Sequence, residues 1–136
     1  MSKNQRLVFL LRDKLGHVDG SNFDDETLTD VPKNTVLLSL ENADVSDLGI
    51  ELLPDLPHLR CIDLDGTQVT DKGMKRIAAF RNLEEVWIEG TQVSDAGLSV
   101  LYPLTNLKFI SVMDCEHISD EAIECLRAAV PGVEVH

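Results

Sequence analysis

The residues of this chain that could do chemistry are mostly carboxylates, and several recur at a fixed spacing. Glu41, Asp65 and Glu89 stand 24 residues apart, while Asp63 and Glu85 precede two of them by two and four places. Paired carboxylates can catalyse acid–base reactions when their environments separate their pKa values, and they bind calcium when a loop supplies about six to eight oxygens. The sequence has no such loop motif, and these carboxylates lie on segments that predict an open sheet face. We therefore expect neither an enzyme nor a calcium site.

The thiols and imidazoles also predict no catalytic or metal site. Cys61, Cys115 and Cys125 form no CxxC pair and are odd in number, which is typical of free thiols in a reducing, cytoplasmic compartment. The acids around Cys61 disfavour a reactive thiolate. No HxxxH or Cys–His spacing occurs among the four histidines, which are His17, His58, His117 and His136. We expect no cofactor, no metal and no catalytic residue.

Length and charge limit the partners that the chain could bind. With 136 residues, 43% of them hydrophobic, the chain is long enough for one domain with a continuous core. Its formal net charge of −12 argues against nucleic acid and anionic membranes and favours a basic protein partner. No apolar run approaches the roughly 18 residues of a membrane span, and the N-terminus lacks a signal-peptide cleavage site. We expect a cytoplasmic monomer.

A repeat of 24 residues organises the chain from residue 35 to residue 127. The segments TVLLSLENADVSDLGI, LRCIDLDGTQVTDKGM, LEEVWIEGTQVSDAGL and LKFISVMDCEHISDEAI align so that their apolar residues share a register, including Leu40, Leu64, Ile88 and Val112. The first half of each unit alternates apolar and polar residues, which predicts a short strand with one buried face. The second half starts at a Ser–Asp or Thr–Asp pair, which is typical of a helix N-terminus. Each unit is thus predicted to be a strand, a turn and a helix.

Such units must stack to bury their apolar faces, which predicts a curved solenoid. The pattern resembles the leucine-rich repeat family, in its bacterial LxxLxLxxTxVTDxGL variety, and CxxISDEAI is similar to the cysteine-containing repeats of F-box substrate receptors. This resemblance implies an α/β fold, a short curved leucine-rich repeat solenoid with a parallel sheet on the concave face and helices on the convex face. It does not specify one function, because the family spans receptors, adaptors and inhibitors.

Small and hydroxyl residues recur at two further positions of the repeat. Gly49, Gly73 and Gly97 follow the helix start, where a small residue would let neighbouring helices approach. Thr67 and Thr91 follow the strand, where a buried hydroxyl could bond free backbone groups, and Cys115 takes that place in the last unit. We expect these side chains to point inward.

The two ends of the chain are predicted to cap the repeats. Residues 4–16 predict an amphipathic helix that seals the first strand, with Leu7, Leu10, Leu11 and Leu15 on one face. Residues 24–30 predict a further short helix or half-repeat that ends before Pro32, and Val133 with Val135 predicts a last edge strand. The predicted organisation is one domain with an N-terminal helical cap (1–34), four repeats (35–127) and a C-terminal capping edge strand (128–136). Capped ends favour a whole protein over a fragment.

Side-chain alternation predicts which residues face out of the concave side. They include the candidate partner-binding residues, which are Glu41, Asp63, Asp65, Glu85, Trp87, Glu89, Phe109 and Met113. Trp87 is predicted at the centre of this face as an exposed anchor, since large aromatic residues often dominate binding. Phe109 and Met113 extend an apolar patch unless the C-terminal segment covers them. The carboxylates either solvate the face or form a docking strip for Lys and Arg.

The sequence thus favours a non-enzymatic protein–protein interaction module that binds a basic or mixed-charge partner through an acidic concave face. Two alternatives stay open. One is an inhibitor or immunity-type protein that blocks a cationic enzyme such as a nuclease or toxin, by analogy with the acidic ribonuclease inhibitors of the same family. The other is an assembly or structural accessory subunit, because short capped repeat proteins resemble an accessory factor of the mitochondrial ATP synthase.

Overall fold

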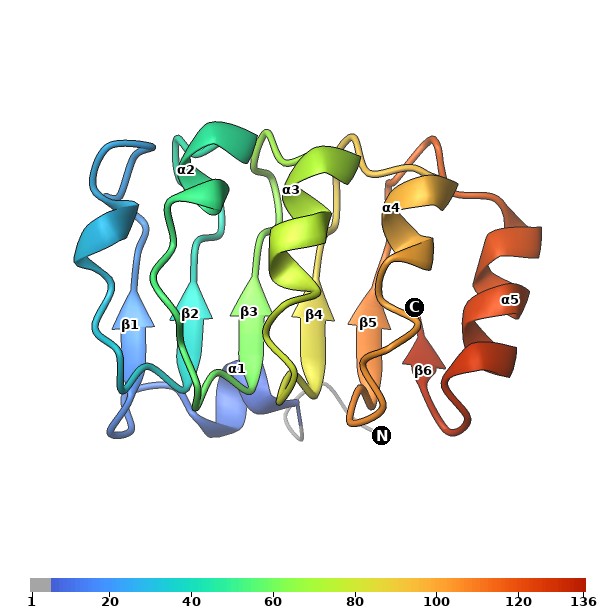
Figure 1. Cartoon of the computed structure of the whole chain (residues 1–136), viewed down its shortest axis with the longest axis horizontal. Coiled ribbons are helices and arrows are strands. Elements are labelled where there is room, and N and C mark those ends of the chain that lie inside the picture. The colour runs from blue at the N-terminus through green and yellow to red at the C-terminus, as the bar shows by residue number, and fades with distance from the viewer. Residues whose placement is uncertain (1–5) are drawn as a thin grey trace.

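A computed structural model describes residues 6–136, which form a solenoid of strand–turn–helix units around one parallel sheet (Figure 1). The sheet has six strands in chain order: β1 (His17–Asp19), β2 (Leu37–Ser39), β3 (Cys61–Asp63), β4 (Glu85–Trp87), β5 (Phe109–Ser111) and β6 (Glu134–Val135). Four helices cover one face of the sheet: α2 (Asp47–Glu51), α3 (Asp71–Ile77), α4 (Asp95–Ser99) and α5 (Asp120–Ala129). The predicted α/β solenoid is confirmed.

The strands pair in the register that the repeat predicts. Leu38 lies beside Ile62, Ile62 beside Val86, and Val86 beside Ile110, and all of these side chains are fully buried. Their column forms the core between the sheet and the helices, together with Leu40, Leu64 and Ile88 and their neighbours. A slip of one residue would have turned these side chains to the other face, so the face assignment from the sequence holds.

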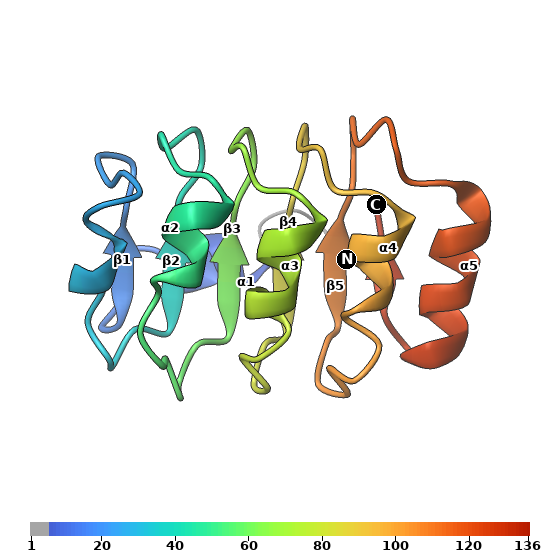
Figure 2. The ribbon, with the colours of Figure 1, turned by 45° about the horizontal axis from the view of Figure 1, so that its top comes forward.

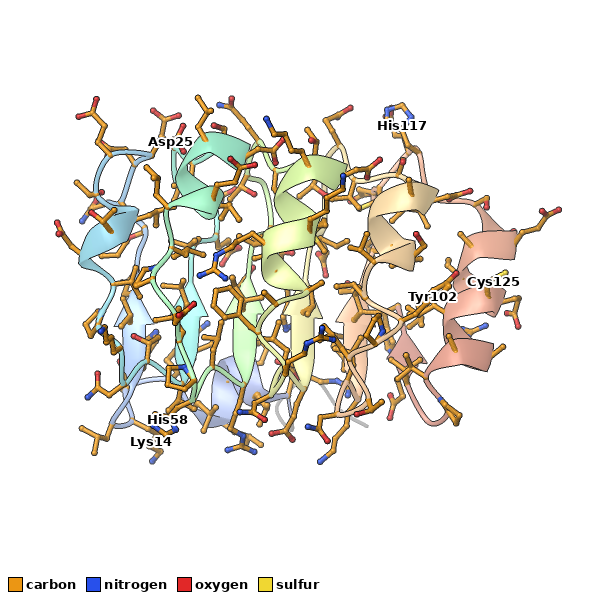
Figure 3. The ribbon with its side chains drawn as sticks, viewed as in Figure 1. Lys14, Asp25, His58, Tyr102, His117 and Cys125 are labelled. Atoms are coloured by element: carbon orange, nitrogen blue, oxygen red, sulfur yellow. The ribbon has the colours of Figure 1, made fainter. Side chains whose placement is uncertain are left out.

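Carboxylates join each unit to the next at the helix starts. We call Asp25, Asp47, Asp71 and Asp95 the aspartate ladder. Each accepts hydrogen bonds from the backbone amide and the hydroxyl of the Ser or Thr that starts the following helix, at residues 46, 70, 94 and 119. Figure 3 shows the first member, Asp25, at the edge of the solenoid beside α2. The sequence predicted Asp47, Asp71 and Asp95 only as residues of helix starts and made no prediction for Asp25, so the link to the next repeat is a new finding.

The repeated glycines are needed because of this ladder. A Cβ atom on Gly73 would lie 2.5 Å from Oδ1 of Asp47, and one on Gly97 would lie 2.3 Å from Oδ1 of Asp71. Real Cβ atoms do not approach oxygen so closely. The predicted packing role is therefore confirmed, although the close neighbour is a carboxylate of the preceding unit.

The turn residues after the strands also behave as predicted. The hydroxyl of Thr67 donates to the carbonyl of Leu64 at 2.7 Å, and that of Thr91 donates to the carbonyl of Ile88 at 2.8 Å. The thiol of Cys115 donates to the same Ile88 carbonyl at 3.0 Å. These buried groups satisfy backbone oxygens that the bend removes from the sheet.

The N-terminal end differs from the prediction. The helix expected over residues 4–16 is wrong, since α1 spans only Leu7–Leu10, and residues 4 and 5 lie outside the described part. It does not seal the first strand; it contacts β2 and β3 on the sheet face opposite to α2–α5 (Figures 1 and 2). Leu15, predicted on its apolar face, is 95% exposed. The segment bends away after one turn, with Asp13 and Gly16 at positive φ.

Two other terminal predictions agree with the structure, whereas the loop predicted at residues 17–22 is wrong because strand β1 begins there. The short helix predicted within residues 24–30 is the 3-10 helix η2 (Leu28–Asp30), and the predicted last strand is β6. Strand β1 extends the sheet into the segment predicted as the N-terminal cap. Among residues 6–136, no helix is long and apolar enough to cross a membrane.

Candidate interaction face

The centre of the concave sheet face is covered by the chain's own N-terminal segment. We call residues 6–16 the strap. Val8 of the strap is 3% exposed and packs in a cluster with Leu37, Cys61, Trp87 and Phe109, which project from four successive strands. This cluster lies on the other side of the sheet from the main core. The solenoid therefore has a second, smaller apolar core on its concave side.

The predicted exposure of Trp87 is wrong. Its side chain does project from the concave face, as the strand alternation requires, but only 8% of it is exposed because the strap covers it. Its ring packs against that of Phe109, with centroids 5.0 Å apart. The indole N–H donates to Oε2 of Glu85 at 2.9 Å. Trp87 therefore anchors the strap in this structure.

Glu85 is the polar centre of this contact, and its predicted role at an exposed surface is also wrong. It is 3% exposed, and its carboxylate accepts hydrogen bonds from the backbone amides of Leu7 and Val8 at 2.8 Å each. It accepts two more bonds, from Trp87 and from the thiol of Cys61 at 3.3 Å. The carboxylate thus caps the free N-terminal amides of α1, a role that an N-cap side chain normally fills.

The two apolar candidates differ in their environments: Phe109 begins β5, and Met113 follows that strand. Phe109 is 3% exposed; the guanidinium of Arg6 lies 3.8 Å over its ring, and the ring of His136 lies 5.1 Å away. The C-terminal covering that the sequence left open thus occurs at Phe109, together with the strap. Met113 is 54% exposed and remains available at the rim.

The other carboxylates gather where the strands end, beside the strap. We call Glu41, Asp63, Asp65 and Glu89 the acidic strip. They line a hollow of about 220 Å³ together with Val8, Phe9, Arg12 and Trp87. Asp63 is buried, Asp65 and Glu89 are half-buried, and Glu41 is exposed. The strip was predicted as a column of exposed acids, so the burial of Asp63 corrects that expectation.

Hydrogen bonds hold three carboxylates of the acidic strip in place. Asp63 accepts from the amide of Asp65 at 3.0 Å, and Asp65 accepts from the amide of Glu89 at 2.7 Å. Glu89 in turn accepts from the hydroxyl of Ser111. These bonds fix the carboxylates without neutralising them, because neither an amide nor a hydroxyl carries a positive charge.

Burial and mutual repulsion change the titration of two strip residues. Burial, followed by repulsion from Glu41, raises the pKa of Asp63 to about 6. Burial, followed by repulsion from Asp63, raises the pKa of Asp65 to about 8. The strip therefore holds protons at pH values where an ordinary aspartate has lost them, and it favours any cation that could replace them.

These pKa shifts predict that the protein loses stability as the pH rises from 5 to 8. The ordinary pKa of aspartate is 3.8, so in this interval the folded chain binds more protons than the unfolded chain, and the free energy of unfolding falls with rising pH. We expect a loss on the order of 1 kcal/mol, since solvent screens the half-buried Asp65. Urea unfolding at several pH values measures it.

The Asp65→Asn variant should flatten this pH dependence, while Asp44→Asn, at an exposed position, should keep it. A rise in the free energy of unfolding with rising pH is expected only at acidic pH. Hydrogen bonds from the amide and hydroxyl of Ser119 lower the pKa of Asp95, whose stabilising contribution is lost only as the pH falls below about 4. An unfolding free energy that rises between pH 5 and pH 8 would contradict the assignment.

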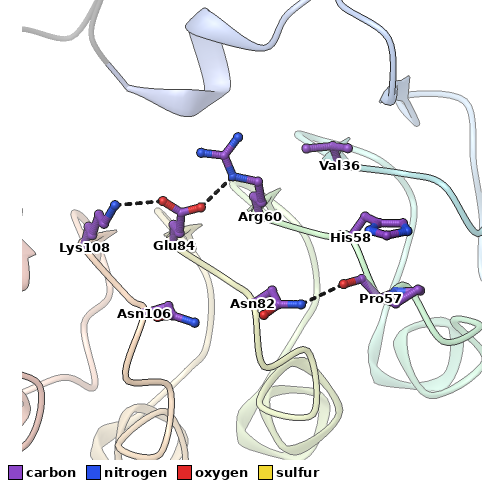
Figure 4. A pocket seen from close by; sticks show the side chains of 8 residues that line it. All are labelled: Val36, Pro57, His58, Arg60, Asn82, Glu84, Asn106 and Lys108. Atoms are coloured by element: carbon purple, nitrogen blue, oxygen red, sulfur yellow. Dashed lines mark hydrogen bonds and ion pairs between the residues drawn. The ribbon is translucent and has the colours of Figure 1, made fainter.

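A larger hollow, of about 600 Å³, lies at the opposite edge, where the strands begin (Figure 4). There Glu84 pairs with Arg60 at 2.5 Å and with Lys108 at 3.0 Å, so one carboxylate is shared by two cations. The amide of Asn82 donates to the carbonyl of Pro57 at 2.8 Å. The charged side chains of this hollow, Arg60, Glu84 and Lys108, are paired with one another, so the hollow offers no unpaired charge to a partner. Sequence reasoning missed this groove, although its residues recur every 24 positions.

The structure brings no other reactive groups together among residues 6–136. No group of three or more His, Cys, Asp or Glu side chains in that range is arranged to hold a metal ion. His58 and His117 lie at opposite edges of the solenoid (Figure 3). Burial, followed by the charge of Glu85, raises the pKa of the Cys61 thiol well above its usual value, which keeps it protonated.

The repeat geometry now agrees with a comparison to known families. Residues 55–78, which run from the end of one unit through β3 into α3, match the family model described as Leucine Rich repeat. This segment therefore resembles a leucine-rich repeat in its sequence and in its strand–turn–helix fold. Leucine-rich repeat domains generally act as protein–protein interaction modules and are typically not enzymes. No curated protein matches the chain significantly. The bacterial variety and the likeness to F-box receptors stay predictions.

Proposed function

We propose that this leucine-rich repeat protein binds a basic protein partner through the acidic strip on its concave face. The observation that carries the proposal is the hollow in which the carboxylates of the acidic strip gather, where burial and mutual repulsion raise the pKa of Asp63 and Asp65. Repulsion among these carboxylates makes the hollow, which Arg12 also lines, a favourable site for a Lys or Arg side chain of a partner. The overall charge of −12 would steer such a partner toward the protein.

The residues of this proposed site differ from the sequence-based set. Glu41, Asp65 and Glu89 provide accessible carboxylates, and Met113 provides an exposed apolar rim. Buried Asp63 acts by raising the negative potential of its neighbours. Trp87, Glu85 and Phe109 hold the strap in this structure. We place the protein in the cytoplasm as a monomer, in keeping with its free cysteines Cys61, Cys115 and Cys125.

Charge reversal tests the proposal. A Glu41→Lys, Glu89→Lys double variant should lose a partner that the wild type captures from native extract at low salt and releases at high salt. We expect a loss of at least about tenfold in affinity, because two close charge pairs change sign. The matched control is Glu51→Lys, Glu121→Lys, which changes the net charge equally on exposed positions of convex helices α2 and α5.

The control must keep the partner, and Trp87 emission must be unchanged in both variants, which shows that the fold and the strap are intact. Equal capture by all three proteins would refute the acidic strip as the site. Binding should also release protons and strengthen as the pH rises from 6 to 8.5, since a bound cation displaces the proton on Asp65. The captured protein's identity then separates an adaptor from an inhibitor of a cationic enzyme or an assembly subunit.

A further inference from the structure

The contacts of the strap with the sheet resemble those of a bound peptide. Its first described residue, Arg6, is 5% exposed and has its guanidinium over the ring of Phe109 and within 2.6 Å of the Glu134 carboxylate. The next two residues direct their backbone amides at Glu85, and Val8 fills the apolar cluster. Side chains of five strands, β2 to β6, thus contact an arginine, two helix-start amides and an aliphatic side chain of the strap.

The strap can dissociate from the concave face of the sheet without unfolding the repeats. Its residues 12–15 lead from the apolar segment toward β1, and all four are exposed. Its helix α1 is a single turn with no side-chain cap of its own. The main core lies on the other face of the sheet and uses residues from β2 to α5 and beyond, without the strap. Displacement therefore costs only the concave contacts and leaves the repeats stacked.

The site beneath the strap would accept an equivalent segment from another protein. We call the side chains of Leu37, Cys61, Glu85, Trp87 and Phe109 the notch. Without the strap or a partner, the apolar walls of the notch would face water, which is unfavourable. The chemistry of the notch is specific: the Glu85 carboxylate within an apolar surface, with Glu134 beyond Phe109, matches a helix start preceded by an arginine.

We propose that the strap is a displaceable internal ligand, and that the notch binds in its place a partner segment that begins a helix with an arginine followed by two aliphatic residues. The inference rests on the proposed function. It adds the notch, as an apolar contact surface for the same partner, to the acidic strip. The strap acts as an autoinhibitory competitor, and only a segment that reproduces its arginine, its amides and its aliphatic side chain binds tightly. The adjacent acidic strip then holds basic residues elsewhere in the same partner.

A peptide of residues 6–16, N-acetylated and fluorescently labelled, is the probe. The apparent affinity of a covered site is reduced by the fraction of time that the site is open, so weakening the strap in the full-length chain should raise peptide affinity. The variant is Val8→Asp, which places a charge in the apolar cluster. The matched control is Leu10→Asp on the same helical turn, where the side chain is 50% exposed.

We expect the peptide to bind Val8→Asp at least about tenfold more tightly than the wild type, and Leu10→Asp to behave as the wild type. Acrylamide should quench Trp87 more strongly in Val8→Asp, and saturating peptide should restore its shielding. Two changes should remove binding: aspartate in place of the valine of the peptide, or Glu85→Ala added to Val8→Asp. Circular dichroism confirms that each variant is folded.

Three results would overturn the proposal. The first is a folded Val8→Asp variant in which Trp87 becomes accessible but the peptide does not bind. The second is peptide binding that Glu85→Ala leaves unchanged. The third is a wild-type dimer in which each copy's strap occupies the other's notch, which sedimentation at several concentrations would detect. These experiments leave Glu41 and Glu89 unchanged. A negative result would therefore refute the role of the notch without refuting the acidic strip as a binding site.

Discussion

Replacing Asp47 with alanine will lower the free energy of unfolding by about 3 kcal/mol. The Asp47 carboxylate accepts hydrogen bonds from the amide and hydroxyl of Thr70 and from the amide of Gly73 at 3.0 Å. Hydrogen bonds to a charged acceptor stabilise by about 1.5–3 kcal/mol each, although bonds to one carboxylate are not additive. Alanine leaves two amides at the start of α3 without an acceptor and removes the link between two successive units.

Urea unfolding followed by circular dichroism measures the effect. Asp44→Ala is the matched control, because Asp44 is exposed, lies three residues away and carries the same charge. We expect it to change the free energy of unfolding by less than about 0.5 kcal/mol. In a repeat protein the stability depends on interfaces between neighbouring units, so Asp47→Ala should also broaden the transition. A loss that both variants share would show that net charge, not the ladder, is responsible.

Residues that obey the 24-residue period could be placed from the sequence alone. The register of Leu38, Ile62 and Val86 is confirmed because each residue is repeated, and an error in one unit would conflict with the others. The helix starts and the turn threonines follow for the same reason. The period also contained the aspartate ladder, but a hydrogen bond from one unit to the next is not visible until the units are stacked.

The strap could not be placed in this way, because it occurs once and has no repeat to define its register. Alternation correctly put Trp87 on the concave face, but its exposure depends on what covers that face. One signal was present in the sequence. Leu37, Cys61 and Phe109 occupy equivalent strand positions on the concave side, and an apolar column facing water predicts a cover. The apolar segment LVFLL at residues 7–11 was the available candidate.

Glu85→Ala will detach the strap and expose Trp87 while the repeats stay folded. Four donors converge on this carboxylate: the amides of Leu7 and Val8, the thiol of Cys61 and the indole of Trp87. Without it, three N–H groups would be buried and unpaired, at a cost of about 1–3 kcal/mol each. Release of the strap hydrates those groups at the expense of the apolar contacts of Val8. We expect a loss of about 3 kcal/mol in the free energy of unfolding.

Trp87 fluorescence reports this release directly, since the chain has one tryptophan. Its emission should shift to longer wavelength and become more sensitive to acrylamide. Glu84→Ala is the matched control, because Glu84 is the adjacent residue and pairs only with exposed groups of Arg60 and Lys108 at the opposite edge. That change should cost less than about 1 kcal/mol and leave the emission unaltered.

The Glu85→Ala variant also separates the two forces that hold the strap. If Trp87 stays shielded, the apolar contacts of Val8 suffice, and the notch would bind any aliphatic segment. If Trp87 is exposed, the carboxylate is required, and an occupant must present free helix amides to it. In that case Val8→Asp opens the notch and leaves its acceptor intact, whereas Glu85→Ala opens the notch and removes the acceptor. Only the first of these open forms should then bind the peptide of residues 6–16.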